Sequence, residues 1–587
     1  MTEGQTLNSS TFLHLLDHMP VGTPVAIDTE TNGYDIRSGE GYAIGVSMSF
    51  RAPALGLVRH YFPLRHNSIA GGDYEKTVQY ELKRIIEKQT CVIFHNAKFD
   101  LVSLATLGIY YTGKFYCTML MAHLINENLP YNKSLDSCGK YYLNDPGKKV
   151  TEPGFALWIK KIGWTNPMPP SLMRAYAEYD ADLTYRLWEL LVTHISWDED
   201  LEEYWCIQKM PYVRLIAKME GRGVRIDVDL CNKMAALGNL QMEEITEILG
   251  LNPGSSKDQK ELFLNRLKLP EVYKKRKNGM STVSFDKDTM ELYDQILERR
   301  QDPTAELVLT YRGWQKSVSS NYRPYVELLS QDGRLRPNYK LHGTKTGRSS
   351  CEKPNLQQIP KVSNKPWNGE MKACFIPEDG FELWEADYSQ LELRLGSAYG
   401  HETELLRAFE EGRDVFTEMS QELKMTRFDT KTLVYSVQYS AGKTRISNVF
   451  GVSMDRAAEI IENFHMRYPG FRSVAKMASS KVKRNGKVKL WSKRYRHFQW
   501  PESENHKAFN SVMQGGAADI MERAMLRLER SIDSDDCRML LMVHDSVVFE
   551  IRKGREGEFI PRIKRVMEAV EPDFGVKFNV EVKRWGE

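Results

Sequence analysis

The stretch LLMVHDSVVFE (540–550) places His544 and Asp545 between two runs of apolar residues. Such apolar runs are typical of a strand that is buried on one or both faces. A carboxylate inside a buried strand is costly unless another group pairs with it or binds it. The stretch therefore predicts a half-buried or buried strand and raises the question of what pairs with or binds Asp545.

A second acid has a similar setting in FELWEADYSQLELRLGS (381–397), where Asp387 ends a strand-like segment. If the two strands are neighbours, Asp387 and Asp545 repel each other unless metal ions hold them. The pair would then form a two-metal site that activates a hydroxyl group and neutralises a triphosphate. The alternative is two unrelated acids at strand ends, which two acids alone do not exclude.

Between these acids, RFDTKTLVYSVQYS (427–440) repeats a long side chain every four residues, at Arg427, Lys431, Tyr435 and Tyr439. On a helix these residues form one slowly drifting stripe, cationic at its first end and aromatic at its second. The stripe suits a triphosphate at one end and a base and sugar at the other. The alternative is a structural aromatic stripe, for which two cations in line are poor core material.

The segment AGKT (441–444) matches only the end of a phosphate-binding P-loop. The full motif needs glycine at position 437, which is Val437 here, and a strand before it. The sequence therefore argues against an ATPase or a helicase.

Carboxylates also gather in the N-terminal part. Asp28 and Glu30 are two residues apart in AIDTET, so both point to one face of a strand. Asp100 closes the strand-like CVIFHNAKFD, and Asp180 follows Tyr176 by one helical turn. Four such acids could hold two divalent ions, and hard oxygen ligands favour Mg²⁺ or Mn²⁺. The alternative is that each acid is a solvated loop residue or a helix cap.

Length and composition indicate a multidomain protein. A chain of 587 residues predicts two to four domains, and 41% hydrophobic and 27% charged residues are ordinary values. The net charge is only +3, with basic runs at 274–277, 481–484 and 492–497 that are each read first as a solvated face. Eight cysteines without a CxxC pair fit a reducing compartment and no structural zinc.

The N-terminal MTEGQTLNSSTF has neither the basic nor the apolar region of a signal peptide. No apolar run approaches the roughly 20 residues that span a bilayer. We expect a cytoplasmic protein, in the host cytoplasm if it is viral, with no membrane partner.

The segments DTET (28–31), HNAKFD (95–100) and YAEYD (176–180) resemble the three motifs of DEDD-type 3′–5′ proofreading exonucleases, in the variant with tyrosine in the third motif. The resemblance implies that Tyr176 orients the attacking water. It also implies four metal ligands, Asp28, Glu30, Asp100 and Asp180.

Five later segments, in unbroken order, resemble motifs of the family A DNA polymerases. They are TKTGRSSCEKPNLQQIP (344–360), DYSQLELR (387–394), RFDTKTLVYSVQY (427–439), HKAFNSVMQGGAADI (506–520) and VHDS (543–546). The resemblance implies that Asp387 and Asp545 are the catalytic metal ligands. It implies dNTP contacts from Arg427, Lys431, Tyr435, Tyr439, Glu392, Gln390 and His544, with Glu392 closing the sugar pocket. It implies DNA contacts from Arg348, Asn355, Gln357, Asn510 and Gln514.

The sequence departs from the family pattern at three positions. Ser546 stands where the family usually has glutamate, Ser440 where it has glycine, and His506 where it has arginine. These positions bear on fidelity, insertion geometry and the grip on the template. A preference for a modified base could be set there, but the sequence does not show one.

The expected fold is a multidomain combination of α/β and α+β parts. An RNase H-like 3′–5′ exonuclease domain covers 1–200, with no room for an N-terminal 5′-nuclease domain. A right-hand polymerase domain covers 201–587, with a thumb at about 205–340, a palm at about 341–405 and 505–587, and fingers at about 406–504.

We expect a monomeric, phage-type replicative enzyme that extends primer 3′ ends on template DNA with dNTPs. It would use two Mg²⁺ or Mn²⁺ ions in each active site and would proofread its product. Binding to primer–template DNA would weaken with salt as cations on the protein neutralise phosphates. The sequence does not tell which replisome or processivity proteins, if any, bind the chain.

Two alternatives stay open. A single-subunit RNA polymerase shares the palm and both aspartates. It lacks an acid at the position that Glu392 occupies here, and it has no editing domain. A nuclease with an inactive polymerase half, or a non-catalytic nucleic-acid-binding protein, is disfavoured by intact Asp387, Asp545, Arg427 and Lys431. Primer extension with dNTPs and with NTPs separates all three.

Overall fold

The computed structural model describes residues 5–33, 35–66, 72–147, 153–161, 168–275, 280–360, 364–438, 441–569, 574 and 576–587. The chain forms two compact units. The first comprises Met1–Gly223, Tyr339–Ser350 and Gly380–Lys583, and the second Val224–Asn338, Cys351–Asp379 and Arg584–Glu587. The first unit contains the predicted exonuclease and fingers and most of the predicted palm, and the second contains most of the predicted thumb and residues 351–379 of the predicted palm. The predicted domain boundaries themselves stay predictions.

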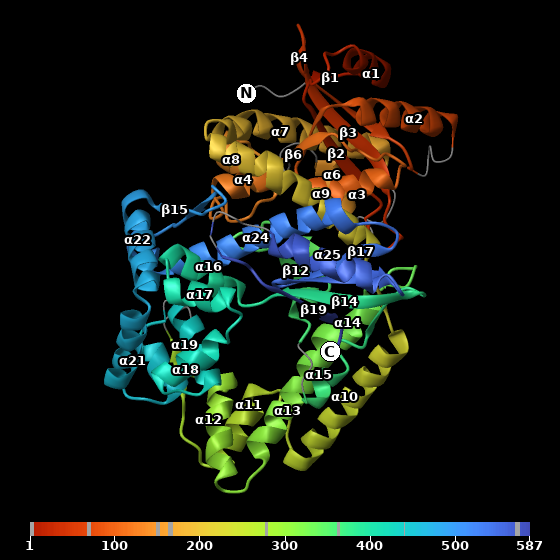
Figure 1. Ribbon diagram of the computed structural model, residues 1–587. Coiled ribbons are helices and arrows are strands. Elements are labelled where there is room, and N and C mark those ends of the chain that lie inside the picture. The colour runs from red at the N-terminus through yellow and green to blue at the C-terminus, as the bar shows by residue number, and fades with distance from the viewer. Residues whose placement is uncertain are drawn as a thin grey trace. The chain divides into compact units, whose positions relative to one another are not determined.

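The N-terminal part of the first unit is built on a six-stranded mixed sheet with the order β1-β4-β3-β2-β5-β6 (Figure 1). The central strand β2 pairs antiparallel with β3 and parallel with β5, and its apolar start, Val25 to Ile27, is fully buried. The long helix α7 packs against β2, β3 and β4. The strands are β1 Gln5–Thr6, β2 Val25–Thr31, β3 Ala43–Ala52, β4 Gly56–Pro63, β5 Cys91–Phe94 and β6 Lys114–Cys117. The helices are α1 Ser9–Asp17, α2 Asp73–Lys88, α3 Ala97–Ala105, α4 Thr118–Ile125, α5 Leu135–Leu143, α6 Pro153–Lys161 and α7 Pro170–Ser196.

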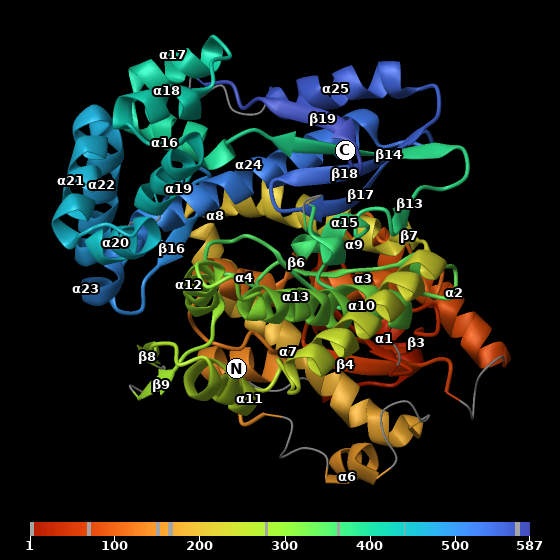
Figure 2. The same cartoon turned by 90° about the horizontal axis from the view of Figure 1, so that it is seen from below.

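A second sheet in this unit has four strands in the order β17-β18-β14-β19 (Figure 2). Its strands are β14 Phe381–Tyr388, β17 Cys537–Val543, β18 Ser546–Arg552 and β19 Val580–Arg584. The helices α24 (Ala508–Ile532) and α25 (Glu556–Glu568) pack against one another and against this sheet.

The segment 540–550 is not one strand, which corrects the sequence interpretation. β17 ends at Val543, His544 and Asp545 form a two-residue turn, and β18 returns antiparallel from Ser546. His544 has a left-handed φ of 57°, as two-residue hairpin turns require. The polar pair therefore turns the chain, while the apolar runs on either side form two buried strands.

The residues between these sheet segments are mainly helical. The elements are α16 Leu391–Gly400, α17 Thr403–Glu410, α18 Val415–Leu423, α19 Arg427–Gln438, α20 Lys443–Phe450, α21 Met454–Arg467, α22 Pro469–Asn485, β15 Lys487–Lys489, β16 Tyr495–His497, α23 Pro501–Glu504 and η6 Asn505–Lys507. The AGKT segment opens α20, and the described residues before it belong to helix α19, so the P-loop context is not met.

The N-terminal part contacts the rest of the first unit through buried polar groups. Arg496 on β16 donates to the Glu127 carboxylate, and both side chains are at most 5% exposed. The His497 backbone N–H donates to the same Glu127 oxygen at 2.7 Å, and Asn128 Nδ2 donates to the His497 carbonyl at 2.9 Å. The chain between the two parts forms α8 Glu199–Tyr204, η2 Trp205–Lys209 and α9 Met210–Arg222, of which η2 and α9 pack on α24.

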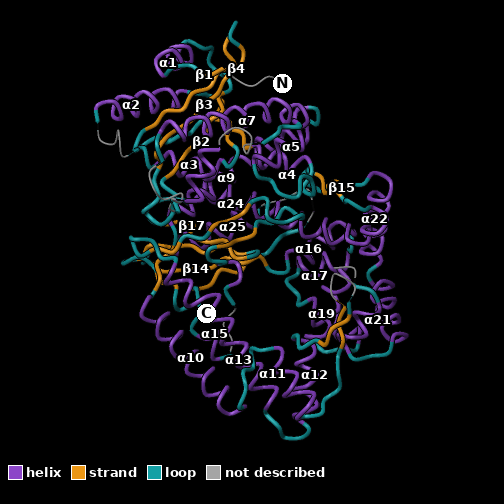
Figure 3. The backbone as a smooth tube through the Cα atoms, turned by 180° about the vertical axis from the view of Figure 1, so that it is seen from behind, coloured by secondary structure: helices purple, strands orange, loops and turns teal. Residues whose placement is uncertain are grey.

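The second unit is mostly helical (Figure 3), with a three-stranded sheet of order β10-β7-β13 and a two-stranded sheet of β8 and β9. Its core includes Phe263, Met290 and Tyr293, all fully buried. Its elements include β7 Val224–Ile226, α10 Val228–Leu249, α11 Ser256–Lys260, η3 Glu261–Arg266, β8 Tyr273–Lys275, β9 Ser281–Val283, α12 Lys287–Glu298, α13 Thr304–Ser317, η4 Val318–Tyr322, α14 Arg323–Glu327, β10 Arg334–Leu335, η5 Leu356–Gln358, α15 Pro366–Gly369 and β13 Phe375–Ile376. The strands β11 Asn338–Lys340 and β12 Ser350–Glu352 form a further two-stranded sheet.

None of the helices in the described part of the chain has the length and apolar character needed to cross a bilayer.

Candidate active sites

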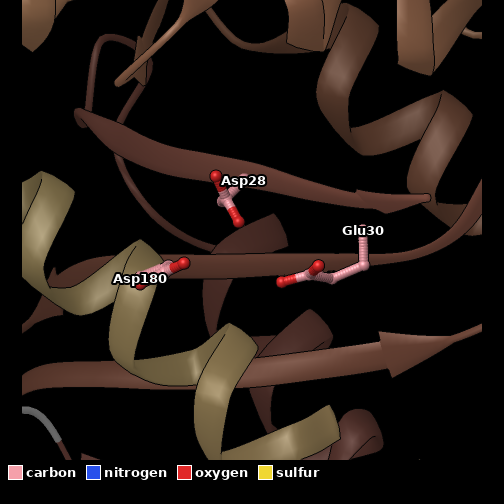
Figure 4. A group of neighbouring side chains, drawn as sticks. All are labelled: Asp28, Glu30 and Asp180. Atoms are coloured by element: carbon pink, nitrogen blue, oxygen red, sulfur yellow. The ribbon is translucent and has the colours of Figure 1, made fainter. Parts of the chain in front are cut away.

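Three of the four N-terminal acids lie together. Asp28 and Glu30 extend from β2, Asp180 extends from α7, and carboxylate oxygens of the three approach within 4.8 Å of one another (Figure 4). The strand spacing puts the first two on one face, and the packing of α7 on β2 brings the third. Glu30 and Asp180 are buried, so like charges there repel unless a cation compensates them. This set of hard oxygen donors fits Mg²⁺ or Mn²⁺.

Asp100 lies beside this cluster, not in it. Its Oδ1 accepts hydrogen bonds from the Thr29 backbone N–H at 3.2 Å and the Thr29 hydroxyl at 2.8 Å. The Thr29 side chain points to the strand face opposite to Asp28 and Glu30, so these bonds hold Asp100 against β2 without placing its carboxylate in the cluster. Burial raises the pKa of Asp100 to about 7. The expectation that Asp100 closes a strand is wrong, because the strand ends at Phe94 and Asp100 lies in the first turn of α3.

Tyr176 lies one turn before Asp180 on α7, and its ring stacks on Phe155 at a centroid distance of 4.0 Å. Burial, and then the nearby carboxylates of Asp180 and Glu30, raise the pKa of Tyr176. The phenol therefore keeps its proton at neutral pH. It can donate a hydrogen bond beside the acidic cluster.

The second acidic site lies where β14 pairs with β18. Asp387 is directly opposite Ser546, and the Tyr388 backbone N–H donates to the Asp545 carbonyl at 3.2 Å. Two aspartates that are 158 positions apart in the sequence are thus held side by side. The Asp545 side chain is 31% exposed, because it belongs to the turn and not to a buried strand.

The acidic site also contains Glu392, in the first turn of α16. Arg348 donates to its buried carboxylate, and the same guanidinium lies 3.6 Å from Oδ1 of Asp545. Gln390, which has a left-handed φ of 57°, precedes α16. Arg348, predicted to contact DNA, therefore here bridges two acids.

Helix α19 presents the predicted stripe on one face. Arg427, Lys431 and Tyr435 all lie against the ring of Phe416, at 5.9, 5.9 and 6.0 Å from it. Nε of Arg427 also donates to Asp414 at 2.8 Å. The stripe therefore exists as far as α19 is described, and its aromatic member is half-buried.

Tyr435 connects this stripe to the acids. Burial raises the pKa of Tyr435 to about 12, and the negative charges of Glu392, Asp545 and Asp387 act in the same direction. Tyr435 therefore lies close enough to all three carboxylates for their charge to affect the ionisation of its phenol. Tyr439, the next member of the stripe, and Ser440 lie outside the described residues.

The remaining predicted DNA contacts are divided between the two units. Asn355 caps the short helix η5, with its side chain accepting from the Gln357 N–H at 3.2 Å, in the second unit. Asn510 and Gln514 lie one turn apart on α24 in the first unit, both half-buried. The structure therefore brings Asp387, Asp545, Glu392 and Tyr435 into one site, but does not place these amides in it.

Sequence reasoning missed two sets of buried polar residues. Glu385 is buried two residues before Asp387, a spacing that could have revealed it. Arg494, in a basic run that was read as a solvated face, is buried. It donates to the Asp519 carboxylate at 2.9 Å and to the Thr346 carbonyl at 2.7 Å. No local pattern reveals that pair, because Asp519 is 25 positions away.

An α/β domain with clustered acids, followed by an antiparallel sheet with paired aspartates, is the architecture of a polymerase that carries an exonuclease domain. The family model described as 3′–5′ exonuclease matches residues 5–196. The model described as DNA polymerase family A matches residues 228–587. The chain therefore belongs to DNA polymerase family A, and the expected fold class is confirmed.

Known relatives are similar over most of this chain. DNA polymerase I of Borreliella burgdorferi is 26% identical across 98% of this chain and 63% of its own length. Thermostable DNA polymerase I of Thermus thermophilus is 30% identical across 71% of this chain and 53% of its own length. The chain thus spans about half to two thirds of these relatives.

A solved structure has the same fold. The POL domain of Pol1 from M. smegmatis, in complex with DNA primer-template and dNTP, superposes with a TM-score of 0.82. The match covers 99% of both chains at 20% sequence identity.

Proposed function

We propose that this protein is a template-directed DNA polymerase that extends primer 3′ ends with dNTPs and edits its product with a 3′–5′ exonuclease. The observation that carries the proposal is the pairing of β14 with β18, which holds Asp387 beside Asp545. Family membership supports it, as does the related M. smegmatis domain with bound primer-template and dNTP.

In the polymerase site, Asp387 and Asp545 would hold two Mg²⁺ or Mn²⁺ ions, which would lower the pKa of the primer 3′-hydroxyl and neutralise phosphate charge. Arg427 and Lys431 would bind the triphosphate with their positive charges. Tyr435 would lie against the sugar.

The same site would select the sugar and hold the DNA. The buried Glu392 would exclude a ribose 2′-hydroxyl by its bulk, with Gln390 and His544 beside the nucleotide. Arg348 would exchange its contacts with acids for contacts with DNA. Asn355, Gln357, Asn510 and Gln514 would contact the primer and template.

In the exonuclease site, Asp28, Glu30, Asp100 and Asp180 would hold the divalent ions that stabilise charge during phosphodiester cleavage. The protonated Tyr176 would donate a hydrogen bond that orients the attacking water. The close approach of three of these acids supports this site.

The proposal includes a monomeric protein in the cytoplasm whose partners are primer–template DNA and dNTPs. The proposal also includes a phage-type replicative role. The relatives named above are bacterial DNA polymerase I proteins.

Primer extension tests the proposal. The purified chain, with Mg²⁺, should extend a primer on a DNA template with dNTPs and use NTPs poorly. Extension with NTPs alone would instead indicate an RNA polymerase. Degradation of the primer without extension under any nucleotide would indicate a nuclease with an inactive polymerase half.

A further inference from the structure

Glu385 is a buried acid on the strand that carries Asp387. Residues two apart on a strand point to the same face, so Glu385 and Asp387 share one face of β14. Ser546 is directly opposite Asp387 in the antiparallel pair, so its side chain lies on that face too. Glu385 is only 8% exposed. The face that presents Asp387 therefore carries a second carboxylate.

The hydroxyl of Ser546 holds this carboxylate in place. Its Oγ lies 3.0 Å from Oε1 of Glu385 and 2.9 Å from the carbonyl oxygen of Val543. The Ser546 hydroxyl thus contacts both β14 and the last residue of β17. Because Ser546 directly follows Asp545, the contact ties the strand of Asp387 to the turn of Asp545.

We propose that Glu385 is a positioning residue of the polymerase site, whose charge, fixed by Ser546, strengthens the binding of divalent cations at Asp387 and Asp545. The inference rests on the proposed polymerase function. A carboxylate that is largely removed from water is screened less than an exposed one, so Glu385 makes the potential at Asp387 and Asp545 more negative and favours cation binding there. Ser546 stands where related sequences usually have glutamate. In this chain, the third acid would thus come from the neighbouring strand.

Equilibrium binding of Mn²⁺, followed by electron paramagnetic resonance, tests the proposal without turnover. All proteins carry Asp28→Ala and Glu30→Ala, so that the exonuclease cluster does not contribute. Glu385→Gln keeps the size and a hydrogen-bond acceptor but removes the charge. It should weaken Mn²⁺ binding about tenfold. The Mg²⁺ midpoint of primer extension should shift equally, while kcat at saturating Mg²⁺ stays near that of the parent.

Two further variants separate charge from fold. Ser546→Ala keeps the charge and removes the hydrogen bond, so it should weaken Mn²⁺ binding less than Glu385→Gln does. Glu581→Gln makes the same charge change at an exposed position on β19 of the same sheet, and should leave binding unchanged.

A swap of the acid between strands gives the decisive comparison. The double variant Glu385→Ala with Ser546→Glu returns a carboxylate to the site from β18. It should recover most of the binding lost in Glu385→Ala, with the fold of each checked by circular dichroism. Parental binding in Glu385→Gln, or a double variant no better than Glu385→Ala, would overturn the inference. A parent that binds Mn²⁺ but never extends primers would instead contradict the proposed function.

Discussion

Tyr435 carries a protonated phenol near three carboxylates. Burial, and then the negative charges of Glu392, Asp545 and Asp387, raise the pKa of Tyr435 to about 12. We predict that Tyr435→Phe makes the enzyme discriminate against dideoxynucleotides. A dideoxynucleotide lacks the 3′-hydroxyl that would otherwise satisfy nearby polar groups, a loss of about 1–3 kcal/mol. The phenol can replace that partner and a phenyl ring cannot, so discrimination should rise about tenfold or more.

The measurement is kcat/KM for dTTP divided by that for ddTTP, with the exonuclease inactivated so that editing cannot remove the terminator. Tyr468→Phe is a matched control, because Tyr468 donates to Glu422 at 3.2 Å, among the other helices of the predicted fingers. Equal ratios for the parent and Tyr435→Phe would mean that Tyr435 does not contact the sugar.

Glu392 is the second residue with a testable role. Its side chain is buried and accepts from Arg348, so Glu392→Ala both opens space and leaves Arg348 with Asp545. We predict a larger share of ribonucleotide incorporation together with a slower overall rate. The kcat/KM values for dCTP and CTP in both proteins give the selectivity. An unchanged selectivity would remove Glu392 from sugar selection.

At single positions, the sequence was informative wherever spacing alone decides which side chains meet. The i, i+2 spacing of Asp28 and Glu30 and the helical turn to Tyr176 anticipate the observed N-terminal cluster. The environment of Asp545 was not predictable in this way. Two apolar runs around a polar pair look the same whether they form one buried strand or two strands joined by a turn. A histidine with positive φ gives no sequence signal.

Among the structural elements, α24 is held by a buried ion pair. Asp519 accepts from Arg494 at 2.9 and 3.0 Å and from the Ser492 hydroxyl at 2.5 Å. Arg494 also donates to the Gly515 carbonyl of α24 at 3.2 Å. The pair thus joins the end of the β15–β16 hairpin to the helix that carries Asn510.

We predict that Asp519→Ala lowers the free energy of unfolding by about 3–5 kcal/mol, because it removes the carboxylate that pairs with the buried Arg494 guanidinium. Denaturant unfolding monitored by circular dichroism gives the value. On the exposed face of α21, Glu459→Ala breaks a 2.7 Å pair with Arg456 and should cost at most about 1 kcal/mol. Equal losses in the two variants would contradict the buried-pair interpretation.

Elements that depend on distant partners were the ones that sequence reasoning misjudged. Arg494 and Arg496 belong to a basic run that reads as a solvated face, yet both are buried because Asp519 and Glu127 meet them. The helical stripe of α19 needed no distant partner, since its period alone fixes its face. Local periodicity was therefore sufficient to predict which side chains share a helix face. It was insufficient to predict which charged side chains are buried.

At the scale of the whole molecule, the two acidic sites lie on different sheets. We predict that Asp28→Ala with Glu30→Ala abolishes 3′–5′ degradation of single-stranded DNA and leaves primer extension largely intact. Asp545→Ala should abolish extension and leave degradation intact. Both activities are measured on one labelled primer, with and without template and dNTPs. Loss of both activities from either change, in a folded protein, would contradict two independent sites.

The buried contact of Glu127 with Arg496 bears on how genes of this kind can recombine. With a parent that differs at both positions, a crossover near codon 200 would separate two side chains that are 369 positions apart, so each hybrid would carry one of them without the other. Removing one partner of a buried pair costs about 3–5 kcal/mol, a large part of a typical stability of about 5–15 kcal/mol. Surviving hybrids should therefore take the residues at positions 127 and 496 from the same parent. These two distant codons would then be inherited together.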